Sequence, residues 1–124
     1  MIEDAVPVLR VPSVALSLAW YHDVLGFEAD AVGPPSDPAF AILRRDGVEL
    51  MLQRVRAGVG PPRSATAAGG GWDVYVRIVD AQAWWEAIRT RVPELAPIHA
   101  TEYGCREFIV VDPDGHVLVF GECG

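Results

Sequence analysis

The chain carries three histidines and two cysteines, the residue types that most often bind metals or act as nucleophiles. His22 falls within a predicted helix, and His99 and His116 fall near predicted turns or strand ends. No HxH or HExxH spacing joins them, no supporting motif groups a serine, a histidine and an aspartate, and no glycine-rich phosphate loop is present. The spacing therefore indicates no catalytic residues.

Cys105 and Cys123 lack the CxxC spacing of redox and zinc sites. We expect ordinary reduced thiols, and the alternative is a disulfide between them. Arg106 is the one basic residue beside Cys105, so we expect no chemical role for this thiol.

Two predicted strands bring polar and aromatic side chains to one face, because successive side chains of a strand point to opposite sides. In the strand over residues 73–79, the valines and the isoleucine should pack on a helix. The residues left for the other face are Asp73, Tyr75 and Arg77. In the strand over residues 48–53, Leu50 and Leu52 belong to the core. The residues left for the other face are Glu49, Met51 and Gln53. An apolar floor is expected from Val6, Val8, Val117 and Val119.

Two aromatic residues stand where a planar ligand could stack on them. Trp72 follows three glycines at the start of the second half, and Tyr103 lies beside Gly104 in a predicted loop. For Trp72 the alternative is a place in a dimer interface. The tryptophans on predicted helices are expected to be core anchors: Trp20, Trp84 and Trp85.

Simpler interpretations stay open for the charged residues. Glu49 could be a solvated or ion-paired strand carboxylate, and Asp73 could pair with Arg77. The arginines after the first half are most simply a solvated loop: Arg54, Arg56 and Arg63.

The first half of the chain, residues 5–53, reads as a strand, a helix and three strands. Ser13 is a good N-cap for a helix that ends near Leu25, and Gly26 suits its C′ position. The apolar stripe expected on this helix consists of Leu16, Ala19, Trp20 and Val24. Strands over residues 39–44 and 48–53 flank an Asp-Gly turn at residues 46–47, a strong hairpin signal.

The same order recurs in residues 72–122, after a linker over residues 54–71 without periodicity. Asp80 is a candidate N-cap for a helix that ends near Arg91, and a short strand is expected around residues 98–101. Strands over residues 106–111 and 116–120 flank a second Asp-Gly turn at residues 114–115. Because each unit is too small to close a core alone, we expect the two to pack together.

Composition excludes several classes of protein. The 124 residues suffice for one domain, and 51% of them are hydrophobic and 22% charged, as in globular proteins. A net charge of −7 makes nucleic acid an improbable partner, because phosphate binding needs a basic surface. No apolar run approaches the length of a membrane span, and the acidic first residues do not resemble a signal peptide. The expected location is therefore cytoplasmic.

Three stretches of the chain resemble one protein family. Residues 9–11 and 19–27 are similar to its common opening, in which an aromatic pair leads into V-L-G-F. Residues 40–50 resemble the first hairpin of its bleomycin-resistance branch, and residues 103–122, with R-E-F and D-P-D-G, resemble that branch's closing segment. On these residues the chain is identified as a member of the glyoxalase/bleomycin resistance/extradiol dioxygenase (vicinal oxygen chelate) superfamily.

The resemblance implies an α+β fold in a single domain over residues 1–124. Tandem βαβββ units would form curved mixed sheets, with helices on the convex face and a ligand cleft on the concave face. A homodimer usually completes that cleft in the family.

Metal-dependent members supply four ligands, usually His, Gln or Glu. The resemblance puts these positions at Val6, Glu49, Asp73 and Val119. Two valines offer no donor atom, whereas a divalent ion needs several nitrogen or oxygen donors. We therefore expect no catalytic metal and no other cofactor.

Our first interpretation is a non-catalytic protein that sequesters a small, planar or cationic, antibiotic-like molecule, as antibiotic-resistance members of the branch do. The expected ligand-binding residues are Glu49, Met51, Gln53, Trp72, Asp73, Tyr75, Arg77 and Tyr103. The alternative is a lyase, isomerase or dioxygenase of the same superfamily that uses Glu49 or Asp73 as a base or partial metal ligand. A third interpretation, a module that binds a partner protein, has no feature in its favour.

Overall fold

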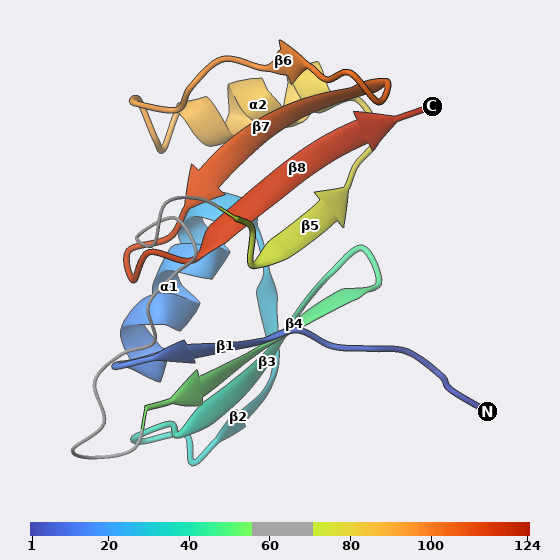
Figure 1. Ribbon diagram of the computed structural model, residues 1–124. Coiled ribbons are helices and arrows are strands. Elements are labelled where there is room, and N and C mark those ends of the chain that lie inside the picture. The colour runs from blue at the N-terminus through green and yellow to red at the C-terminus, as the bar shows by residue number, and fades with distance from the viewer. Residues whose placement is uncertain (56–70) are drawn as a thin grey trace. The chain divides into compact units, whose positions relative to one another are not determined.

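The computed structural model describes residues 1–55 and 71–124, which form two compact units within Met1–Pro62 and Arg63–Gly124 (Figure 1). The described part of each unit contains one helix and one four-stranded sheet. The predicted α+β class and the repeated βαβββ order are therefore confirmed. Most of the predicted linker lies outside the described residues, as do Arg56 and Arg63.

The first unit contains a mixed, curved sheet. Its elements are β1 (Val8–Val11), α1 (Val14–Leu25), β2 (Glu28–Gly33), β3 (Phe40–Arg45) and β4 (Val48–Arg54). The strand order is β1-β4-β3-β2, with β1 parallel to β4 and the other pairs antiparallel. Arg54, predicted to lie in a loop, ends β4, and its Nη1 donates to Asp37 at 3.1 Å.

Helix α1 begins and ends as predicted, but it buries a different side. Ser13 accepts the Leu16 N–H at 3.2 Å, and Gly26 ends the helix in the left-handed conformation with φ 72°. The predicted stripe is wrong, because Leu16 is 75% exposed. The side chains that are buried are Val14, Ser17, Tyr21 and Leu25. Since this helix is apolar on nearly all sides, its periodicity could not select the face that packs on the sheet.

The second unit repeats the arrangement. Its elements are β5 (Val74–Arg77), α2 (Ala81–Arg89), β6 (His99–Ala100), β7 (Cys105–Val111) and β8 (Val117–Cys123). The strand order is β5-β8-β7-β6, with β5 parallel to β8. Asp80 caps α2 as predicted, since its Oδ1 accepts the Ala83 N–H at 3.1 Å.

The core of the second unit lies between its sheet and α2. Phe108 and Phe120 stack across β7 and β8, with ring centroids 5.3 Å apart, and Trp84 of α2 lies 5.7 Å from Phe120. Trp84 thus contacts this core, although it stays partly exposed. Trp85 is half-buried, and its indole N–H donates to the Ala96 carbonyl at 2.9 Å.

Both predicted Asp-Gly turns are present. Asp46 and Gly47 join β3 to β4 with φ values of 50° and 80°, and Gly115 has φ 88° in the turn before β8. Among the described residues, neither helix has the length and apolar character needed to cross a membrane.

Candidate functional site

The sheet of the second unit has one face beneath α2 and an opposite face that carries polar and aromatic side chains. Phe108 and Phe120 point toward α2, so alternation turns their neighbours in the strands to the opposite face. The residues on that face include Tyr75, Arg77, Glu107, Ile109, Val119, Gly121 and Cys123. This is the facing expected from the sequence for Tyr75 and Arg77. Their contact with a ligand stays a prediction.

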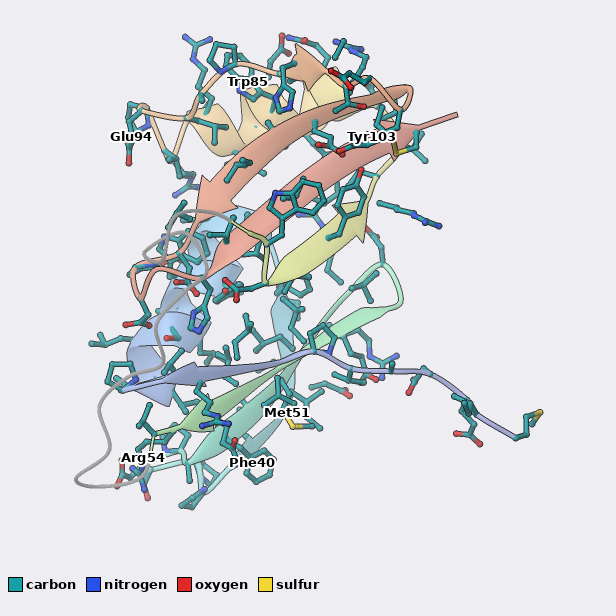
Figure 2. All side chains as sticks on the ribbon, in the orientation of Figure 1. Phe40, Met51, Arg54, Trp85, Glu94 and Tyr103 are labelled. Carbon is teal, nitrogen blue, oxygen red and sulfur yellow. A yellow bond between two sulfur atoms is a disulfide. The ribbon has the colours of Figure 1, made fainter. Side chains whose placement is uncertain are left out.

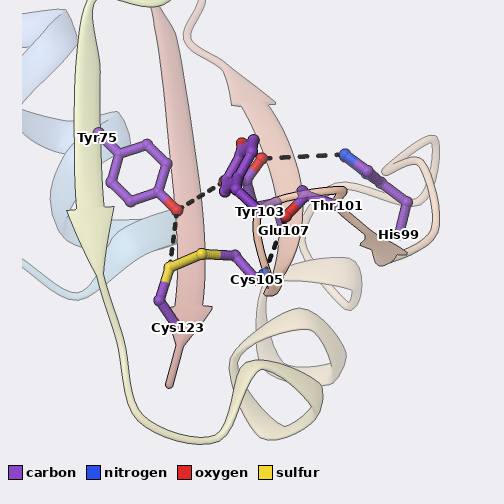
Figure 3. The surroundings of a disulfide bond; sticks show 7 residues. All are labelled: Tyr75, His99, Thr101, Tyr103, Cys105, Glu107 and Cys123. Carbon is purple, nitrogen blue, oxygen red and sulfur yellow. Dashed lines mark hydrogen bonds and ion pairs between the residues drawn. A yellow bond between two sulfur atoms is a disulfide. The ribbon is translucent and has the colours of Figure 1, made fainter.

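Glu107 is the centre of a hydrogen-bonded cluster on this face (Figure 3). The hydroxyls of Tyr75 and Tyr103 both donate to its Oε2, each at 2.6 Å. Glu107 is only 2% exposed, and bonds from hydroxyls to a carboxylate are short and strong. We call Tyr75, Tyr103 and Glu107 the tyrosine–glutamate cluster.

Glu107 is not among the ligand-binding residues expected from the sequence. A signal was available, because Glu107 is an acidic residue in a run of mostly apolar ones, on the same face of β7 as Ile109. Its tyrosine partners could not be identified in advance, since Tyr75 lies 32 residues away.

Gly121 makes room for the cluster. It is in register with Arg77 on one side and with Glu107 on the other, so it lies on β8 between β5 and β7. A Cβ placed on Gly121 would collide with the Tyr75 hydroxyl and would lie 2.6 Å from Cζ of the same ring. The missing side chain therefore lets the Tyr75 ring cross β8 and reach Glu107.

The surroundings raise the pKa of both tyrosines. Burial raises the pKa of Tyr75 to about 12, and its hydrogen bond to Glu107 is the next largest cause. For Tyr103 the hydrogen bond to Glu107 is the main cause of a raised pKa. Both hydroxyls therefore keep their protons at neutral pH and act as donors.

Exposed aromatic rings adjoin the tyrosine–glutamate cluster. Trp72 is 51% exposed, and its ring centroid lies 5.5 Å from that of Tyr75 at an interplanar angle of 42°. Tyr103 is 61% exposed on the tight turn before β7, where the Gly104 N–H donates to the Thr101 carbonyl at 3.3 Å. These rings offer flat surfaces to a ligand.

The two cysteines form a disulfide, so the expected reduced thiols are wrong. Cys105 and Cys123 are partners in the β7–β8 register, with Cα atoms 4.3 Å apart. Antiparallel neighbours of the non-hydrogen-bonded kind lie this close, which brings the two sulfurs within bonding reach. Cys123 Sγ lies 3.3 Å from the Tyr75 hydroxyl, so the disulfide borders the tyrosine–glutamate cluster.

Asp73 is engaged by the backbone of β8. Its Oδ2 accepts the Val117 N–H at 2.8 Å, and its own N–H donates to the Val117 carbonyl at 2.9 Å. No ion pair joins Asp73 to Arg77 in the described part of the chain, so that alternative is wrong. Asp73 therefore helps to hold the start of β8.

The histidines serve separate local contacts. His116 is buried with Nδ1 2.8 Å from Asp112 Oδ2, and this hydrogen bond is the main cause of its raised pKa. His22 is exposed, and its hydrogen bond to Asp23, followed by the charge of Glu28, raises its pKa. Nε2 of His99 lies 3.9 Å from Oε1 of Glu107.

The predicted residues of the first unit share one face of its sheet. Leu50 and Leu52 are fully buried, so Glu49, Met51 and Gln53 point to the face opposite α1. Phe40 and Met51, labelled in Figure 2, are on that same face, since Phe40 pairs with Gln53 and Ile42 with Met51. This facing too is the one expected from the sequence.

Glu49 is an ion-paired carboxylate, which was the simpler of its two interpretations. Arg44 Nη2 lies 2.9 Å from Glu49 Oε2 and 3.4 Å from Asp30 Oδ2. Glu49 is 21% exposed, so Arg44 holds a half-buried negative charge. Because the Arg44 side chain is 51% exposed, water screens the pair, and such a pair contributes about 0–1 kcal/mol to stability.

The residues at the inferred metal positions do not fit a divalent ion. Val6 and Val119 have no donor atom, Arg44 engages Glu49, and the backbone of β8 engages Asp73. Across residues 1–55 and 71–124, no group of three or more His, Cys, Asp or Glu side chains could hold a metal. We therefore derive no chemistry from a metal.

Two shallow depressions lie elsewhere on the units. One, of about 400 Å³, is lined by Gly26, Glu28, Ala29, Asp30, Arg44, Arg45 and Asp46. The other, of about 260 Å³, is lined by Gln82, Trp85, Pro97, Ile98 and Arg106. Neither includes a predicted ligand-binding residue, and both are wide open to solvent.

Comparison with known proteins shows the family. Residues 5–120 match the Glyoxalase/Bleomycin resistance protein/Dioxygenase superfamily, and the chain belongs to it. A search of curated proteins found no match.

Solved structures share the fold along the whole chain. The bleomycin-binding protein from bleomycin-producing Streptomyces verticillus, solved with copper(II)-bleomycin, is 27% identical with a TM-score of 0.71, covering 100% of this chain and 99% of its own. A glyoxalase-related enzyme from Clostridium phytofermentans is 15% identical with a TM-score of 0.79, covering 100% and 97%. A bleomycin resistance determinant of transposon Tn5 is 18% identical with a TM-score of 0.75, covering 98% of each chain. A bleomycin-binding protein, a bleomycin resistance determinant and a glyoxalase-related enzyme thus share this architecture, so the fold alone does not select between binding and catalysis.

Proposed function

We propose that this protein binds and sequesters a small, planar or cationic, antibiotic-like molecule without transforming it. The observation that carries the proposal is the face with Trp72 and Tyr103 exposed beside the buried carboxylate of Glu107. Aromatic faces bind planar groups by stacking and cations through the ring quadrupole. The likeness to a bleomycin-binding protein over both full lengths supports the same function.

The proposed contacts on the second unit are Trp72, Tyr75, Tyr103, Asp73 and Arg77. Those proposed on the sheet face of the first unit are Glu49, Met51 and Gln53. Most ligand pockets combine apolar walls with a few fixed polar groups, and each face offers such a mixture.

Binding without catalysis is supported by the residues at the inferred metal positions. Val6 and Val119 offer no ligand atoms, and Glu49 and Asp73 already have partners. Within residues 1–55 and 71–124, no group of side chains favours the enzymatic alternative.

Calorimetric titration with copper(II)-bleomycin and with metal-free bleomycin tests the proposal, alongside a thermal-shift screen of planar cations. We expect saturable binding and recovery of the ligand unchanged by mass spectrometry. Trp72→Ala should weaken binding roughly tenfold, about 1.4 kcal/mol, through the loss of stacking. Trp85→Ala, on the helix-covered side, is the matched control. Chemical conversion of the probe would instead favour the enzyme, and no binding by any probe would contradict sequestration.

We further propose that residues 1–124 act as a single domain in a homodimer whose subunit contact completes the ligand cleft. The compartment expected from the sequence is the cytoplasm. The family resemblance supports the dimer. The disulfide argues against the compartment, because structural disulfides are rare in the cytosol. Light scattering that gives the mass of one chain at all concentrations would contradict the dimer, and cell fractionation tests the compartment.

A further inference from the structure

Glu107 is a buried acidic group whose direct partners are neutral donors. Two phenol hydroxyls bond its Oε2, and the ion-pair contact that it makes is to His99, at 3.9 Å. No arginine forms an ion pair with Glu107 within the described residues. The buried carboxylate of Glu107 therefore has no arginine as a counter-ion in this part of the chain.

Arg77 is the cation in the same row of the sheet. It is in register with Gly121, which is in register with Glu107, so two strand spacings, about 10 Å, separate the backbones. Among the causes that shift the pKa of Tyr75, the lowering by the charge of Arg77 is the smallest. The guanidinium of Arg77 nevertheless forms no ion pair with Glu107 in the described part of the chain.

The charge of Glu107 affects a ligand through the rings of Tyr75 and Tyr103, whose hydroxyls donate hydrogen bonds to its carboxylate. A phenol that donates to a carboxylate gains electron density on its ring, and a richer ring attracts a cation more strongly. Tyr103 is exposed, and Trp72 extends the aromatic surface from Tyr75. The buried charge is thus presented to a ligand as two electron-rich rings.

The carboxylates that the sequence suggested are less suited to this role. The guanidinium of Arg44 lies 2.9 Å from Glu49 Oε2 and compensates the charge of that carboxylate. The carboxylate of Asp73 accepts a hydrogen bond from the Val117 N–H at 2.8 Å. Neither of these two carboxylates accepts a bond from an aromatic side chain among the described residues.

We propose that Glu107 sets a preference for cationic aromatic groups on this face, acting through the hydroxyls of Tyr75 and Tyr103. Glu107 is a positioning residue, since the rings, and not the buried carboxylate, would touch the ligand. The inference rests on the proposed function only in requiring that this face bind a small molecule.

The test compares N-methylacridinium with acridine at mildly alkaline pH, where acridine is uncharged and has nearly the same shape. Affinity is measured by calorimetry and by quenching of indole fluorescence. The unmodified protein should prefer the cation. Glu107→Gln should weaken N-methylacridinium roughly tenfold and change acridine by less than about twofold. The pKa of Tyr103, followed by NMR, should fall toward its ordinary value in the same variant, because the main cause of its rise is removed.

Glu102→Gln is the matched control, because it removes the same charge from the exposed residue beside Tyr103 and leaves the cluster intact. It should alter the affinity for the cation by less than about twofold. If Glu107→Gln fails to fold, Tyr103→Phe removes one hydroxyl, keeps the Tyr75 bond, and should still weaken the cation selectively. Equal effects of Glu107→Gln and Glu102→Gln, or failure of the unmodified protein to prefer the cation, would overturn the inference.

This outcome can be separated from that of the proposed function. Binding of copper(II)-bleomycin with no cation preference would leave the proposed function standing and remove the role of Glu107. Selective binding of N-methylacridinium without binding of bleomycin would support the role of Glu107 and would contradict a bleomycin-type ligand.

Discussion

The Tyr75 hydroxyl lies 2.6 Å from Glu107 Oε2, although 32 residues separate the two and β8 runs between their strands. Gly121 allows this contact, because no side chain stands on β8 where the ring crosses. Tyr103 bonds the same oxygen from the turn before β7. One carboxylate oxygen thus joins β5, β7 and that turn.

Gly121→Ala should destabilise the protein by roughly 1–3 kcal/mol, because the new Cβ would occupy the space of the Tyr75 hydroxyl. Denaturant unfolding measures the loss. In a Tyr75→Ala background the same substitution should cost much less, since the obstructing ring is gone. An equal cost in both backgrounds would mean that the ring does not cross β8 at Gly121.

Loss of the disulfide should lower the free energy of unfolding by about 3 kcal/mol, the loop-closure value for cysteines 18 residues apart. The comparison is between the unmodified protein and the Cys105→Ser/Cys123→Ser variant, each unfolded with and without reductant. Reductant should destabilise only the unmodified protein. Two titratable thiols in protein denatured without reductant would contradict the disulfide.

His116 should make stability depend on pH. Its pKa is raised in the folded state by the hydrogen bond to Asp112, so the folded state binds the proton more tightly than the unfolded chain. The stabilisation is complete below the ordinary pKa of 6.5 and is lost as the pH rises through the higher folded value. The advantage in unfolding free energy over His116→Gln should therefore be largest below pH 6.5 and should shrink as the pH rises above that value. An NMR titration that gives His116 a pKa below its ordinary value would contradict this.

Protein purified without added metal should contain no stoichiometric transition metal, because Val6 and Val119 provide no ligand atoms. Elemental analysis measures this directly. Stoichiometric zinc, iron, manganese or nickel that is lost on Glu49→Gln or Asp73→Asn would contradict the expectation. The enzymatic alternative would then take first place.

Local signals in the sequence determined the elements and much of their facing. Ser13 and Asp80 identify the starts of the helices, because their side chains satisfy backbone N–H groups of the first turn. Asp46-Gly47 identifies a hairpin, because both residues tolerate positive φ. The alternation of side chains along a strand then predicted that Tyr75 and Glu49 lie on the sheet face opposite the helix. Each of these inferences depends on residues only a few positions apart.

Tertiary structure alone decided which of these features meet. Helix α1 is apolar on most sides, so only packing selected Tyr21 and Leu25 for burial and left Leu16 exposed. The bond from Tyr75 to Glu107 depends on the strand order β5-β8-β7 and on Gly121 between them, which no local pattern encodes. The disulfide likewise depends on the β7–β8 register. Periodicity reports the side of a strand on which a residue lies, whereas its partners there depend on how distant strands align.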